Sequence, residues 1–100
     1  MPWSGELAYL IKPKSGPVRV MHTLLDANRA LMDDLAPQTR RRAHWQYAGW
    51  LLIKAAQTGN SDDVVAATDS LVDALDIEGW MTATHARNVP PNPTRLQSEL

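Results

Sequence analysis

The segment from residue 39 to residue 58, TRRRAHWQYAGWLLIKAAQT, places the tightest constraint on how this chain can fold. On a helical wheel its apolar side chains cover well over half of the circumference. They are Trp45, Ala48, Leu51, Leu52, Ile53, Ala55 and Ala56. A helix on the surface of a globular protein usually shows an apolar stripe of about 100°. The wider arc predicts a central helix that packs against neighbours on more than one side.

Local signals for helix ends predict two more helices, one on each side of this segment. Thr23 and Asp26 have the spacing of a capping box, in which each residue bonds to the backbone of the other. Gly59 can adopt the left-handed conformation that ends a helix, and Asn60 or Ser61 can cap the next one. The predicted helices span residues 24–36, 39–58 and 61–76.

The segment before the first helix has the character of a β-hairpin. Residues 7–11 and 18–22 are rich in β-prone side chains, and residues 12–17, KPKSGP, form a turn between them. Residues 79–84 are a candidate third strand. We therefore predict an α+β fold over residues 1–84, with an N-terminal β-hairpin packed on a three-helix core. Residues 85–100 lose periodicity and contain three prolines, which predicts an extended or disordered tail.

Composition narrows the class of protein. The net charge of −1 gives no overall attraction to nucleic acid or to anionic membranes. The chain has no cysteine, so disulfides and thiolate zinc sites are excluded. It also contains no apolar run of the ~20 residues that a membrane span requires, and its start lacks the pattern of a secretory signal. We expect a cytoplasmic protein of one domain.

Motifs for catalysis or cofactor binding are missing from the sequence. His22, His44 and His85 lack the spacing of metal ligands, and the serines lack a nucleophile-elbow context. The glycine patterns of dinucleotide and nucleoside triphosphate sites do not occur. We expect no enzymatic activity, no cofactor and no metal.

Arg40, Arg41 and Arg42 form the most conspicuous charged cluster. Three cations in the first turn of a helix oppose its macrodipole, so Asp33 and Asp34 across the short turn are candidates to neutralise them. The cluster is also a candidate contact for phosphate or nucleic acid, because Trp45, Tyr47 and Lys54 follow it along the helix. A protein partner is the third interpretation.

Tyr47 and Trp50 lie on or beside the polar side of the predicted central helix, where aromatic residues are unexpected. Three explanations stay open at this stage. The two side chains could pack under the hairpin, line a small-molecule pocket, or form an exposed contact surface of the kind in which Trp and Tyr are enriched.

Residues 16–80 resemble a family of short alphaproteobacterial proteins, many from rhizobia, that is known only as a domain of unknown function. The resemblance depends on Pro17-Val18, the helix 24–35, Pro37, Tyr47-Ala48, the turn Gly59-Asn60-Ser61 and Val65-Ala66-Ala67. The chain departs from the family pattern at Ala36, where an aromatic residue is frequent, and at Asp76, where a glycine is usual. The resemblance implies a bacterial origin and a fold, but no activity.

These observations favour a non-catalytic interaction or regulatory module that forms a homodimer, with Tyr47 and Trp50 among its contact residues. A nucleic-acid-binding regulator that uses residues 40–42 and Lys54 is the first alternative. A protein that binds a small ligand or effector between the hairpin and the central helix is the second.

Overall fold

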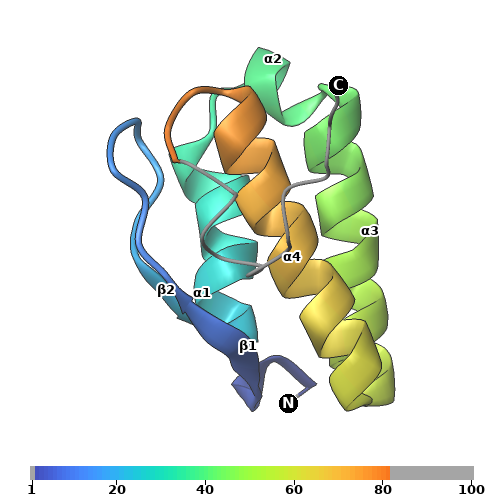
Figure 1. Ribbon diagram of the computed structural model, residues 1–100. Helices are drawn as coiled ribbons and strands as arrows, with labels where there is room; N and C mark the ends of the chain where they lie inside the picture. The colour runs from blue at the N-terminus through green and yellow to red at the C-terminus, as the bar shows by residue number, and fades with distance from the viewer. Residues whose placement is uncertain (1, 82–100) are drawn as a thin grey trace, which may run out of the picture.

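The computed structural model describes residues 2–81, and it places a two-stranded antiparallel hairpin against a layer of helices (Figure 1). The predicted α+β class is confirmed. In chain order the elements are η1 (Pro2–Ser4), β1 (Glu6–Ile11), β2 (Met21–Thr23), α1 (Leu24–Arg29), η2 (Ala30–Asp34), α2 (Pro37–Arg40), α3 (Ala43–Thr58) and α4 (Ser61–Ile77).

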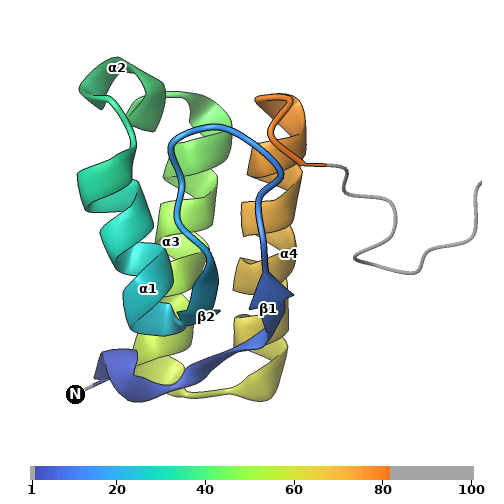
Figure 2. The ribbon, with the colours of Figure 1, turned by 90° about the vertical axis from the view of Figure 1, so that its left-hand side faces the viewer.

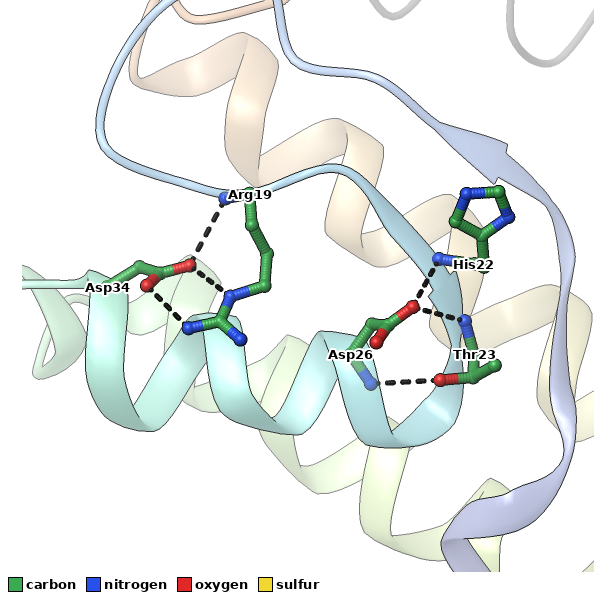
Figure 3. A network of polar contacts seen from close by, with 5 residues as sticks. All are labelled: Arg19, His22, Thr23, Asp26 and Asp34. Carbon is green, nitrogen blue, oxygen red and sulfur yellow. Dashed lines mark hydrogen bonds and ion pairs between the residues drawn. The ribbon is translucent and has the colours of Figure 1, made fainter.

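Helix α1 begins at the predicted capping box. The hydroxyl of Thr23 accepts a hydrogen bond from the Asp26 backbone N–H at 3.0 Å, and the Asp26 carboxylate accepts from the N–H groups of Thr23 and His22 (Figure 3). These bonds, above all the one from His22, lower the pKa of Asp26. The helix continues without a break into η2, a π-helical turn in which the Leu35 N–H reaches back to the Ala30 carbonyl.

Strand β2 begins three residues later than predicted, at Met21 instead of residue 18. The backbone N–H of Arg19 donates to the Asp34 carboxylate, so it is not available to a neighbouring strand. The Arg19 guanidinium binds both oxygens of the same carboxylate, at 2.8 and 2.9 Å (Figure 3). This bidentate pair lowers the pKa of Asp34 and holds the loop before β2 against the end of η2.

Helix α4 packs against both α3 and β1, while α3 lies between α4 and α1. The hairpin covers α1 and α4 on the side away from α3 (Figure 1), and Figure 2 shows α3 behind it, between α1 and α4. Among the described residues, the buried side chains are apolar apart from Thr68 and Ser70. The Thr68 hydroxyl accepts a hydrogen bond from the Ala8 N–H of β1 and donates to the Val64 carbonyl. The largest fully buried side chains are Trp45, Ile11, Met21, Leu52, Leu71, Leu75, Val72 and Thr68.

The prediction for the central helix is confirmed at its C-terminal end, Thr58, and in its packing against neighbours on more than one side. The predicted N-terminal end is wrong. The helix begins at Ala43 instead of Thr39, because the extended backbone of Arg42 separates it from the short helix α2. The break removes Arg40 and Arg41 from the first turn of α3, where their charges would oppose the helix dipole. The outer side of α3 is open, and Ile53, expected in the core, is 49% exposed.

Residues 79–81 form a turn and a bend, and within the described chain the sheet has only two strands. The remainder of the candidate third strand, residues 82–84, and the predicted tail, 85–100, lie outside the described residues. The turn nevertheless returns to the hairpin, since the Trp80 carbonyl accepts hydrogen bonds from the N–H groups of Lys14 and Ser15.

Gly16 permits this contact between the hairpin loop and Trp80. Its φ is +82°, and a Cβ atom at this position would lie 2.4 Å from the Trp80 ring. We expect Gly16→Ala to lower the free energy of unfolding by about 2 kcal/mol, of which about 1 is backbone strain and the rest is displacement of the ring. Urea denaturation of Gly79→Ala provides the control. Gly79 has a φ of +81° with no atom near its missing Cβ, so equal losses in the two variants would contradict the ring contact.

Candidate functional site

The outer side of α3 carries an exposed aromatic pair. Tyr47 and Trp50 are 59% and 58% exposed, and their rings stack with centroids 6.4 Å apart and an interplanar angle of 23°. The Lys54 ammonium lies 5.6 Å from the Trp50 ring centroid, within the range of a cation–π contact. We call Tyr47, Trp50, Ile53 and Lys54 the aromatic face.

The structure excludes one of the three explanations for the aromatic pair. Packing under the hairpin is wrong, because the hairpin covers α1 and α4 and does not reach the outer side of α3 (Figure 1). The wheel showed correctly that Trp50 points away from the buried side of its helix. It could not show which side of the helix the hairpin would cover.

A groove of about 330 Å³ runs beside Trp50, between α3 and the segment formed by α1 and η2. Met32 on η2, which is 57% exposed, and Ile53 on α3 contribute apolar walls. Gly49 faces Leu31 across the groove, and a Cβ atom at this position would lie 3.5 Å from the Leu31 side chain, an ordinary contact distance. The lining residues are Asn28, Leu31, Met32, Arg40, Trp45, Gln46, Gly49, Trp50, Leu52 and Ile53. The aromatic face and the groove together form a continuous, largely apolar surface.

The three arginines do not act as one cluster. The Arg40 guanidinium donates to the Met32 carbonyl at 2.9 Å and so satisfies an exposed helix end, whereas Arg42 donates to Glu78 at 2.7 Å. The predicted neutralisation by Asp34 is wrong, because Arg19 occupies that carboxylate. Among residues 2–81, the Arg41 side chain has no polar partner. A phosphate group would therefore meet one guanidinium without an intrachain bond.

Glu78, at the end of α4, binds three donors from the start of α3. Its Oε1 accepts from Arg42, and its Oε2 lies 2.8 Å from His44 Nε2 and 3.0 Å from Trp45 Nε1. The Glu78 side chain is only 7% exposed. Burial raises the pKa of this carboxyl, but the hydrogen bonds from His44, Trp45 and Arg42 act in the opposite direction and outweigh it. The pKa of Glu78 is therefore lowered.

Sequence reasoning did not identify Glu78, because its partners lie 33–36 residues away and no local pattern links them. Both carboxylate oxygens are engaged by donors of the same chain. We conclude that this cluster of Glu78 with Arg42, His44 and Trp45 clamps the start of α3 to the end of α4.

A second hollow, of about 820 Å³, lies where α3 ends and α4 begins, at the end of these helices away from Glu78. It is bordered by η1 and the start of β1 on one side and by the turn between α3 and α4 on the other. Its lining residues are Ser4, Gly5, Glu6, Leu7, Ala8, Leu24, Ala55, Ala56, Gln57, Thr58, Gly59, Ser61, Val64 and Val65. Within the described residues, both this hollow and the groove beside Trp50 are candidate places for a small ligand.

Over residues 2–81 the acidic and histidine side chains do not gather in a group of three or more that could hold a metal ion. None of the helices in this range has the length and apolar content needed to cross a membrane. Comparison with protein-family models, curated proteins and solved structures finds no match.

Proposed function

We propose that this protein is a non-catalytic, cytoplasmic interaction module that self-associates as a homodimer through the aromatic face. The observation that carries the proposal is the exposure of Trp50 and Tyr47 as a stacked pair beside a largely apolar groove. Large aromatic side chains that are held in one conformation lose little entropy on binding. Tryptophan and tyrosine are enriched at the centres of protein interfaces for this reason and for their large apolar area.

Groups around the pair support contact with a protein. Met32 and Ile53 extend the apolar surface on both walls of the groove, while Gln46 and Lys54 supply polar groups at its border. This pattern of an apolar centre with a polar rim is typical of interfaces that exclude water at their centre.

Light scattering coupled to size-exclusion chromatography tests the proposal. We expect a dimer at high micromolar concentration and a dissociation constant that rises at least about 30-fold in Trp50→Ala, since truncation of a hot-spot residue costs 2 kcal/mol or more. Leu10→Ala is the matched control, because Leu10 is 50% exposed but lies on β1, away from the aromatic face. A strict monomer at these concentrations would contradict the proposal.

A further inference from the structure

We propose that two copies of this chain pair through α3 in antiparallel orientation, around a two-fold axis that passes close to Trp50. This inference rests on the proposed self-association and adds the orientation and the contacts of the second copy. A two-fold interface is self-complementary, so each residue before Trp50 meets a residue at the same distance after it in the other copy.

The position of Trp50 along its helix suits such an axis. Helix α3 spans Ala43–Thr58, so seven residues precede Trp50 and eight follow it. The groove lies on one side of Trp50, and its volume is about 330 Å³. A cavity of about 150 Å³ holds a benzene ring, so the groove has room for an indole. Each Trp50 side chain can then enter the groove of the other copy.

The charges at the two ends of α3 are opposite in sign. Arg40 and Arg41 precede the helix, whereas Asp62 and Asp63 follow it. The Asp63 carboxylate lies at the end of α3, where one oxygen accepts a hydrogen bond from the Thr58 hydroxyl at 2.7 Å and the other lies 3.9 Å from the Lys54 ammonium of the same chain. Antiparallel pairing brings the basic end of one copy to the acidic end of the other, and parallel pairing brings like charges together. Electrostatic complementarity of this kind fixes the orientation of an interface.

Close to the proposed axis, the charged side chains of the two copies do not repel each other strongly in this arrangement. Lys54 is the only charged residue of α3, and it lies four residues, or about 6 Å, from the proposed axis. The two Lys54 residues of a dimer are then about 12 Å apart along the helices, which exceeds the screening length of about 8 Å at physiological ionic strength. Lys54 of one copy faces Gln46 of the other.

Disulfide trapping tests the orientation of the two copies. The chain contains no cysteine, so every disulfide that forms involves an introduced residue. Gln46→Cys and Lys54→Cys change exposed positions and leave Trp50 in place. We expect a mixture of the two variants, under mild oxidation, to give the mixed disulfide as the major product by mass spectrometry. Each variant alone should give several-fold less of its own disulfide, because Cα atoms more than 7 Å apart cannot be bridged. Leu10→Cys mixed with Lys54→Cys measures the background.

The possible results separate this inference from the proposed function. Self-linking of each variant as efficient as mixed linking would indicate parallel pairing and overturn the inference. A dimer by light scattering without disulfides above background would place the interface on another surface. That result would overturn the inference while leaving self-association intact. A monomer at high micromolar concentration would overturn both.

Discussion

Replacement of Trp45 by alanine is expected to lower the free energy of unfolding by about 3–5 kcal/mol, the usual cost of removing a large buried aromatic side chain. Trp45 is 1% exposed, and its ring lies 6.2 Å from that of Trp80 and 5.6 Å from that of His44. Its indole N–H also donates to Glu78. The substitution therefore leaves a cavity at the junction of α3 and α4 and removes a donor from the clamp.

Urea denaturation of three variants checks this expectation. Trp50→Ala is the matched control, since it makes the same change in the same helix at a side chain that is 58% exposed. We expect its free energy of unfolding to fall by only about 1 kcal/mol at concentrations where the protein is monomeric, because only the contacts with Tyr47 and Lys54 are lost. Trp45→Phe keeps most of the ring and should lose about 1–3 kcal/mol, which covers the case in which Trp45→Ala does not fold. Equal effects of Trp45→Ala and Trp50→Ala would contradict the assigned packing.

The elements that could be predicted from the sequence are those fixed by neighbouring residues. The capping box joins Thr23 to Asp26, three positions apart, and the structure contains both of its hydrogen bonds. Gly59 adopts the expected left-handed conformation, with φ at +66°, and the Asn60 side chain caps α4. Such signals act within one turn of the chain, so a single sequence contains all of their causes.

The break between α2 and α3 was not predicted from the sequence. The apolar periodicity is uninterrupted from Trp45 onward, and it says nothing about residues 39–42. Arg42 becomes extended, and its guanidinium then reaches Glu78 on another helix. The predicted start of β2 was wrong for a similar reason, because the backbone N–H of Arg19 bonds to Asp34, fifteen residues away. In both places a charged partner distant in sequence determines the local backbone.

The candidate surface was identified only in part. The wheel singled out Tyr47, Trp50 and Lys54 as side chains on the polar side of α3, and all three are exposed. Met32, in contrast, was not among the predicted contact residues, yet it is 57% exposed and lines the groove. Periodicity gives the direction of a side chain around its own helix. The groove also requires the relative position of α1 and α3, which tertiary packing alone determines.

Replacement of Glu78 by alanine is expected to lower the free energy of unfolding by about 3–4 kcal/mol at neutral pH. Hydrogen bonds to a charged group contribute about 1.5–3 kcal/mol each, but Arg42 regains water when its partner is lost, so the three bonds do not add in full. The buried N–H of Trp45 is left without an acceptor. Asp76→Asn, an exposed carboxylate on the same helix, is the control and should change stability by less than about 0.5 kcal/mol.

The dependence on pH distinguishes loss of the Glu78 charge from loss of its packing. Because the pKa of Glu78 is lower in the folded protein than its ordinary value of 4.5, ionisation of this group stabilises the folded state above that value. The stabilisation disappears as the pH falls through the folded-state pKa. Glu78→Gln keeps the size of the side chain but cannot ionise. The difference in unfolding free energy between wild type and Glu78→Gln should therefore be constant near neutral pH and shrink below about pH 4.5. Asp26 and Asp34, whose pKa values are also lowered, contribute equally to both proteins and cancel in this difference. A difference that stays constant down to pH 2 would show that the clamp acts through packing, without a contribution from charge.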